Sequence, residues 1–155
     1  MGKKSAGILP YRRRNDRLEV LLAHPGGPFW KNEDLGAWSI AKGECEEGEE
    51  PLQAALREFF EETGHRPSGP FLSLMPRKQP SGKWVYAWAA ESDWDSSGLI
   101  SNAFSMEWPK GSGRIREFPE VDRAEWFDIP EGKRRIRPGQ RGFLEELSEK
   151  LPSSE

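Results

Sequence analysis

Three glutamates are spaced so that their side chains can act together. Glu58, Glu61 and Glu62 stand at i, i+3 and i+4, which on an α-helix places them within about 100° of one another on a single face. Carboxylates at this spacing repel one another unless a cation lies nearby. Arg57 supplies one positive charge, and the oxygen-preferring ions Mg²⁺, Mn²⁺ and Ca²⁺ are candidates for the remainder. The cluster is therefore a candidate metal site, although a solvated face is the commoner outcome for three glutamates alone.

The residues around this cluster follow a longer pattern. Residues 43–65 read GECEEGEEPLQAALREFFEETGH. This run resembles the signature of the Nudix hydrolases, G-x5-E-x7-R-E-U-x-E-E-x-G-U, where U is usually Ile, Leu or Val. Every fixed position matches: Gly43, Glu49, Arg57, Glu58, Glu61, Glu62 and Gly64. A motif of this length is specific. The two U positions depart from it, because Phe59 is aromatic and His65 is not apolar.

The resemblance implies a metal centre that handles a phosphoanhydride. The implied ligands of Mg²⁺ or Mn²⁺ are all oxygen donors: the carbonyl of Gly43 and the carboxylates of Glu58, Glu61 and Glu62. Arg57 and Glu49 would hold the loop and orient the carboxylates. Such a metal neutralises developing charge, orients a diphosphate and lowers the pKa of a bound water. We therefore expect hydrolysis at this motif.

The general base is left open by the resemblance. Members of the family use either a glutamate of the motif, here Glu58 or Glu61, or a glutamate on a later loop or strand. Outside the motif, Glu107 is the first candidate, with Glu117 and Glu120 behind it. A surface position is the commoner fate of each of these three residues.

Two positions upstream of the motif are expected to bind substrate. The segment GAWSIAKGE resembles the strand and loop that lead into the motif in this family, with Ala41 in place of the usual proline. Lys42 resembles the P-K-G subset associated with dinucleoside polyphosphates and diphosphoinositol phosphates. Trp30 lies in a loop rich in Pro and Gly, residues 25–36, and is the tryptophan that we expect to meet a nucleobase.

Two basic stretches, residues 12–14 and 133–137, are most simply solvated surface. Their alternative is phosphate contact, on the substrate or on RNA. Residues 111–116, GSGRIR, lack a phosphate-loop pattern and are expected to form a mobile loop.

The elements that must position these residues follow from residue patterns. Pro51 suits a helix start and Gly64 a helix end, and the apolar period between them predicts a helix over residues 51–63. A second helix is expected at residues 139–151. Strands are expected at residues 6–12, 18–24, 37–40, 71–75, 83–90, 104–108 and 124–129. This order fits the α/β class, an α/β/α Nudix sandwich with a mixed central sheet and the catalytic loop-helix at residues 43–64.

Composition limits the remaining possibilities. The 155 residues fit one domain, 1–155, and seven Trp and eight Phe supply a core. The net charge of −3 argues against a dedicated nucleic-acid binder. The single cysteine cannot form an intramolecular disulfide and favours a reducing compartment. No run approaches the roughly 20 apolar residues of a membrane span, so we expect a cytoplasmic protein without membrane partners.

The expected function is hydrolysis of the phosphoanhydride of a nucleoside diphosphate linked to another moiety. Nucleoside triphosphates or dinucleoside polyphosphates are the expected substrates, with Mg²⁺ or Mn²⁺ as cofactor. The alternatives are removal of pyrophosphate from RNA 5′ ends and a non-catalytic nucleotide-sensing module. We expect a monomer or a homodimer.

Overall fold

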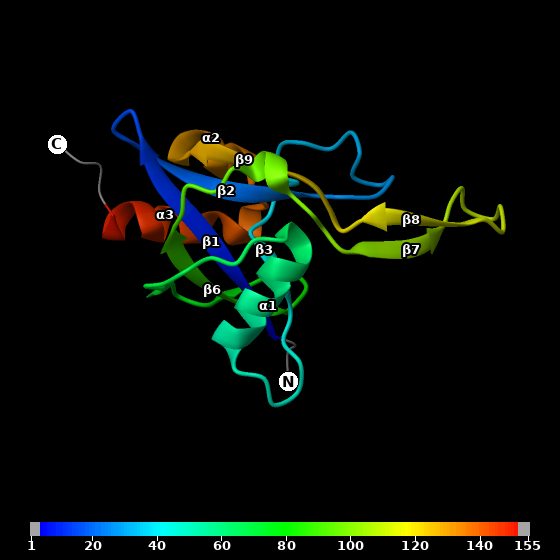
Figure 1. Ribbon diagram of the computed structural model, residues 1–155, viewed down its shortest axis with the longest axis horizontal. Helices are drawn as coiled ribbons and strands as arrows, with labels where there is room; N and C mark the ends of the chain where they lie inside the picture. The colour runs from blue at the N-terminus through cyan, green and yellow to red at the C-terminus, as the bar shows by residue number, and fades with distance from the viewer. Residues whose placement is uncertain (1–3, 152–155) are drawn as a thin grey trace.

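Strand β1 (Lys4–Arg14) runs through the centre of the sheet in the computed structural model, which describes residues 4–151 (Figure 1). It pairs in parallel with β6 (Trp84–Glu91) and antiparallel with both β2 (Arg17–Pro25) and β3 (Ala41–Glu44). The outer strands are β9 (Val121–Asp128), which pairs with β2, and the short β4 (Leu72–Ser73) and β5 (Arg77–Lys78), which pair with β6. The sheet is mixed, as predicted.

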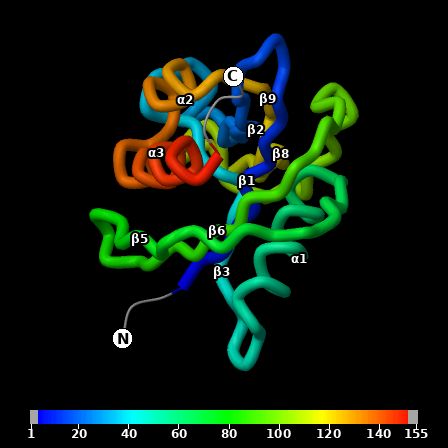
Figure 2. The backbone as a smooth tube through the Cα atoms, turned by 90° about the vertical axis from the view of Figure 1, so that its left-hand side faces the viewer, coloured from blue at the N-terminus to red at the C-terminus, as the bar shows by residue number. Residues whose placement is uncertain are grey.

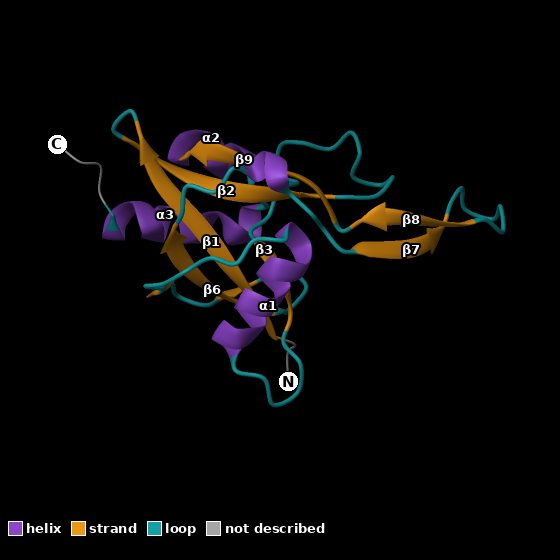
Figure 3. Ribbon diagram, viewed as in Figure 1, coloured by secondary structure: helices purple, strands orange, loops and turns teal. Residues whose placement is uncertain are grey.

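Helices cover both faces of this sheet (Figure 3). Helix α1 (Pro51–Thr63) lies on one face, while α2 (Ile129–Arg135) and α3 (Arg141–Lys150) lie on the other (Figure 2). The alternation along each strand supplies both cores. In β2, Val20 and Leu22 join the core on the α3 side, whereas Leu21 and Ala23 join the core on the α1 side. The predicted α/β/α sandwich is confirmed.

Helix α1 has the predicted bounds. Pro51 starts it, and Gly64 ends it in the left-handed conformation, with φ 79° and its N–H donating to the Phe60 carbonyl at 2.7 Å. Phe59 is fully buried, whereas the neighbouring Phe60 faces outward and carries the Arg66 guanidinium over its ring. The departures at Phe59 and His65 thus leave the helix and its exit intact.

Several strand predictions were wrong in position or length. Residues 37–40 form isolated bridges, Ala23 with Ser39 and Trp38 with Ile136, and the strand begins only at Ala41. The Gln140 side chain takes the place of a ladder partner, because its Oε1 accepts from the Ile40 N–H at 3.0 Å. The predicted strand 71–75 shrinks to β4.

The loop expected at residues 111–116 is confirmed for 111–114, whereas residues 115 and 116 already belong to a strand. Ile115–Pro119 forms β8, which pairs antiparallel with β7 (Ala103–Glu107). The two strands project from the main body as a separate hairpin (Figure 1). Helix α2 was not predicted, because its seven residues begin with Ile-Pro and contain no apolar period.

Two 3₁₀ turns complete the described chain, Ser96–Gly98 and Pro138–Gln140. Within residues 4–151, no helix is long and apolar enough to cross a membrane. The predicted single domain, residues 1–155, extends into residues 1–3 and 152–155, which lie outside the described part.

Candidate active site

Arg57, in the second turn of α1, ties the preceding loop to the helix. Its Nε donates to Glu49 Oε2 at 2.9 Å and its Nη2 donates to Glu49 Oε1 at 3.0 Å. Its Nη1 donates to Glu58 Oε1 and to Glu61 Oε2, both at 2.9 Å. The hydrogen bonds from Arg57 are the main reason that the pKa of Glu49 falls to about 2. These contacts fit the orienting role expected of Arg57 and Glu49.

Gly43 lies where β3 passes beneath α1. It pairs with Ala6 of β1, and a Cβ added at Gly43 would collide with the Glu58 carboxylate. The missing side chain therefore permits the strand backbone and the helix carboxylate to approach each other. A glycine at this position of the motif thus leaves the space that the Glu58 carboxylate occupies.

Glu62 is the carboxylate of the cluster that has no cationic contact at hydrogen-bond distance. Its Oε2 is buried and has no hydrogen-bond partner. Burial, followed by the negative charges of Glu58 and Glu120, raises its pKa to about 8. Burial also raises the pKa of Glu58, against the lowering effect of Arg57. An anionic Glu62 is unfavourable here without an added cation.

The donor chemistry fits a hard divalent cation, but the ligands are not preassembled. Among residues 4–151, no three Asp, Glu, His or Cys side chains are gathered closely enough to hold a metal ion together. Arg57 engages Glu58 and Glu61, whereas Glu62 Oε2 faces no partner. Arg57 Nη1 contacts one oxygen of each of these two carboxylates, Glu58 Oε1 and Glu61 Oε2, so the second oxygen of each is outside these contacts. The carboxylate oxygens of Glu58, Glu61 and Glu62 are the type of ligand that Mg²⁺ or Mn²⁺ prefers, and Glu62 Oε2 has no hydrogen-bond partner.

The structure separates the first outside candidate for the general base from the cluster. Glu107 ends β7 at the turn of the projecting hairpin, and its two carboxylate oxygens accept the N–H groups of Gly111 and Gly113, each at 2.9 Å. It stabilises that turn. Glu120, which precedes β9, is near the cluster instead: it lines a cavity with Glu62, and its charge contributes to the raised pKa of Glu62. Of the outside candidates, Glu120 lies beside the cluster and Glu107 lies in the hairpin turn, and the identity of the general base stays a prediction.

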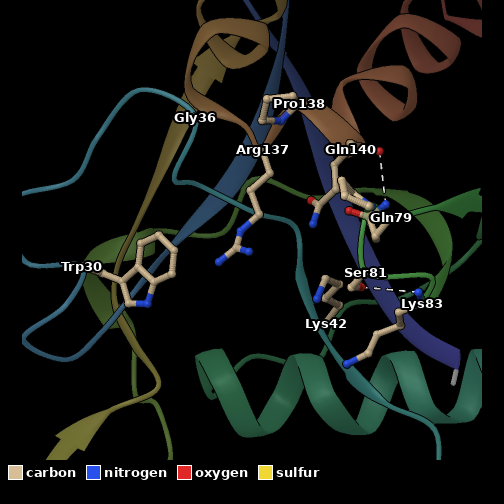
Figure 4. Close-up of a pocket in the computed structure, with 11 residues that line it drawn as sticks. Trp30, Gly36, Lys42, Gln79, Ser81, Lys83, Arg137, Pro138 and Gln140 are labelled. Atoms are coloured by element: carbon tan, nitrogen blue, oxygen red, sulfur yellow. Dashed lines mark hydrogen bonds between the residues drawn. The ribbon is translucent and has the colours of Figure 1, made fainter.

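Lys42 lies on β3 and lines both this cavity and a larger pocket. The smaller cavity, of about 150 Å³, is lined by Lys42, Arg137, Glu62 and Glu120 among others. The larger pocket, of about 490 Å³, also includes Lys42 and Arg137 in its lining, together with Trp30 and Lys83 (Figure 4). Burial is the main cause that lowers the pKa of Lys42, and repulsion from Arg137 adds to it. Lys42 and Trp30, both predicted from sequence, thus share one pocket.

Arg137 is the pocket residue that the sequence did not single out. It belongs to the stretch 133–137, whose other basic residues mostly form ion pairs: Lys133 with Glu145, Arg134 with Glu131, and Arg135 with both Glu131 and Asp34. Arg137 instead stands over the Trp30 ring, 4.9 Å from its centroid. A usable signal was the following Pro138, which favours the extended backbone that Arg137 adopts.

The other basic stretch, residues 12–14, lies on the surface. Arg12 contacts Glu19 at 2.8 Å and Asp93 at 3.0 Å, and its guanidinium stands over Trp126. Arg14 shares Asp93 at 3.1 Å. These ion pairs favour the surface interpretation of this stretch over a phosphate site.

Comparison with known proteins gives one family model that matches most of the chain. The NUDIX domain model matches residues 1–147. An octanoyltransferase of Myxococcus xanthus is 33% identical over 133 residues, which are 86% of this chain and 33% of that protein. An RNA pyrophosphohydrolase of Roseobacter denitrificans is 46% identical over 63 residues, 38% of each chain. The chain spans about a third of the length of these curated relatives.

Solved structures share the fold at low sequence identity. A binary complex of the Ap4A hydrolase of C. elegans superposes with a TM-score of 0.63 at 20% identity, covering 95% of this chain and 97% of that one. This similarity extends over the sheet and its covering helices.

Proposed function

The chain belongs to the Nudix family, and on that premise we propose that it is a metal-dependent hydrolase of phosphoanhydride bonds. The proposed substrates are nucleoside diphosphates linked to another moiety, either nucleoside triphosphates or dinucleoside polyphosphates. The proposed cofactor is Mg²⁺ or Mn²⁺, held by Glu58, Glu61 and Glu62 with the Gly43 carbonyl.

One observation carries this proposal: a buried glutamate oxygen without a partner lies in the same cavity as two basic side chains. Glu62 lines the cavity with Lys42 and Arg137. Carboxylates attract a cation, and the basic side chains attract the anionic oxygens of a phosphate. A diphosphate bridging the two would satisfy both sets of groups.

Each nearby residue has a part in the proposed reaction. A bound metal would supply charge neutralisation and a water of lowered pKa. The two hydrogen bonds to Glu49 fix the Arg57 guanidinium, and its Nη1 holds the carboxylates of Glu58 and Glu61 in place. Lys42 pairs with oxygens of the diphosphate, and Trp30 contacts the moiety beyond it. Glu120 takes the proton of the attacking water, because it lies outside the Arg57 network and close to Glu62.

A second candidate is removal of pyrophosphate from RNA 5′ ends. Support comes from relatives named RNA pyrophosphohydrolase, one of them 46% identical over 63 residues. The paired state of Arg12 and of most residues in 133–137 weakens the electrostatic case for RNA, since an RNA site needs available cations. A non-catalytic nucleotide sensor is disfavoured because such modules typically lose carboxylates of the motif, and this chain has all of them.

A substrate panel with Mg²⁺ and Mn²⁺ tests the proposal. It contains nucleoside triphosphates, dinucleoside polyphosphates, sugar nucleotides and a short 5′-triphosphorylated RNA. We expect turnover of a free nucleotide to exceed that of the RNA. Equal or better turnover of the RNA would favour the second candidate, and no turnover of any compound would favour the sensor.

A further inference from the structure

The hairpin of β7 and β8 leaves strand edges open. It forms a two-stranded sheet of its own and projects from the main body, and no other described segment lies along the outer edge of β7 (Figure 1). A two-stranded sheet alone in water is only marginally stable, and an unpaired edge offers its N–H and C=O groups to another strand. The hairpin is therefore a candidate surface for strand pairing.

The pairing pattern of the hairpin shows which backbone groups of β7 point to the open edge. Opposed residues of an antiparallel pair alternate between a hydrogen-bonded and a non-hydrogen-bonded arrangement. The Trp108 N–H donates to the Arg114 carbonyl at 3.0 Å, and Pro119, which has no N–H, stands opposite Ala103. Every second residue counted back from Trp108 thus turns its backbone groups toward β8. The residues between them turn their N–H and C=O groups outward: Ala103, Ser105 and Glu107.

Strand β7, AFSME, is complementary to a second copy of itself. Its central residue, Ser105, is exposed. In an antiparallel pair related by a two-fold axis at Ser105, Phe104 stands opposite Met106 of the partner subunit, and Ala103 stands opposite Glu107 of the partner subunit. The first pair joins an aromatic ring to a thioether, and the second sets no like charges against each other. Pairing of this edge with itself is therefore chemically favourable.

Strand β8, IREFP, is poorly suited to the same pairing. A two-fold axis at its central residue would set Glu117 against Glu117 of the partner subunit, and directly opposed like charges destabilise a sheet. Its outward positions also include Pro119, which offers no N–H to a new strand. The outer edge of β7 is thus the edge that suits a second copy.

The charges at the two ends of the hairpin favour the same arrangement. Lys110, Arg114 and Arg116 are exposed near its tip. At its base, the Asn102 N–H donates to the Glu61 carbonyl at 2.8 Å, so the base adjoins the acidic C-terminal end of α1. An antiparallel pair brings the basic tip of each hairpin toward the acidic end of α1 in the other copy, where opposite charges attract.

We propose that β7 pairs antiparallel with β7 of a second copy of this chain, about a two-fold axis at Ser105, and so joins the two hairpins in one sheet. Phe104 and Met106 then contact each other across the axis. A one-strand interface is small, so the dimer forms reversibly. Its formation requires no substrate and goes beyond the proposed hydrolysis.

Sedimentation velocity of the full chain over a wide concentration range tests the pairing. We expect wild-type protein to shift from monomer to dimer as its concentration rises. Ser105→Pro removes an outward N–H from β7 in each copy but no donor from the β7–β8 ladder, and it should raise the dissociation constant about tenfold or more. Glu117→Pro is the matched control. It makes the same change at the residue directly opposite Ser105, on the outer edge of β8, and should leave the dimer intact.

A charge pair at position 105 tests the register without a proline. Ser105→Lys and Ser105→Glu each set like charges against each other at the axis, so each variant alone should dimerise severalfold more weakly than wild type. An equimolar mixture of the two should associate, because opposite charges then meet. Wild-type protein that stays monomeric at every concentration would overturn the proposal. An unchanged dimer in Ser105→Pro, an equal loss in Glu117→Pro, or a mixture that associates no better than either variant alone would also overturn it.

Discussion

The guanidinium of Arg57 and the carboxylate of Glu49 meet in a two-point fork, Nε to Oε2 at 2.9 Å and Nη2 to Oε1 at 3.0 Å. The contact joins the loop before α1 to the helix, and the same guanidinium reaches Glu58 and Glu61. Loop geometry and carboxylate position are therefore set by one side chain.

Arg57→Lys should separate geometry from charge. A lysine keeps the positive charge but cannot form the fork, so we expect kcat to fall tenfold or more and the free energy of unfolding to fall by about 1–2 kcal/mol. Steady-state kinetics and urea unfolding measure these effects. Arg66→Lys, just beyond the same helix and stacked on Phe60, is the control and should retain kcat. Unchanged kcat in Arg57→Lys would show that charge alone suffices.

Metal-free protein should lose stability as pH rises from about 4.5 toward 8. The pKa of Glu62 is about 8 in the folded chain, above its ordinary value of 4.5, so the folded state holds a proton that the unfolded state releases across this window. Below pH 4.5 the group is protonated in both states and has no effect. Urea unfolding in EDTA at several pH values measures this slope, and Glu62→Gln should flatten it. An identical slope in wild type and Glu62→Gln would contradict the assignment.

Gly43→Ala should damage the site through a steric effect. The added methyl group collides with the Glu58 carboxylate, so that carboxylate must leave its position beside Arg57 or the backbone must shift. We expect a loss of about 1–3 kcal/mol in the free energy of unfolding and a lower kcat. Gly98→Ala is the control, since its Cβ would meet only Trp94 Nε1 at 3.9 Å. Thermal melts and kinetics of both variants provide the comparison, and wild-type behaviour of Gly43→Ala would refute the close approach.

Glu120→Gln and Glu107→Gln should differ sharply. Glu120 shares a cavity with Glu62, whereas Glu107 stabilises the hairpin turn through Gly111 and Gly113. We expect kcat to fall roughly 10²-fold in Glu120→Gln, the size typical of a lost general base, and to stay near wild type in Glu107→Gln. The opposite ranking would restore Glu107 as the base.

The sequence predicted the helix α1 and the spacing of its glutamates well. It predicted poorly which residues from distant parts of the chain contact the site. Pro51, Gly64 and the glutamate spacing are all contained in one short segment, so the sequence reveals them directly. The strand expected at 37–40 failed because Gln140, a hundred residues later in the chain, hydrogen-bonds Ile40. Arg137 was missed for the same reason: its neighbours in sequence are ion-paired surface residues, and only folding places it over Trp30. The sequence around Glu107 and Glu120 does not show which of them lies near the cluster. The fold does, because it places Glu107 at the turn of the β7–β8 hairpin and Glu120 beside Glu62.

The central claim, hydrolysis at a metal held by the α1 glutamates, is tested most directly by turnover of the best substrate in Glu62→Gln and Glu61→Gln. The account predicts that kcat falls by roughly 10² or more in each variant, with circular dichroism unchanged, and that excess EDTA abolishes wild-type turnover. Full activity in either variant, or in excess chelator, would contradict it.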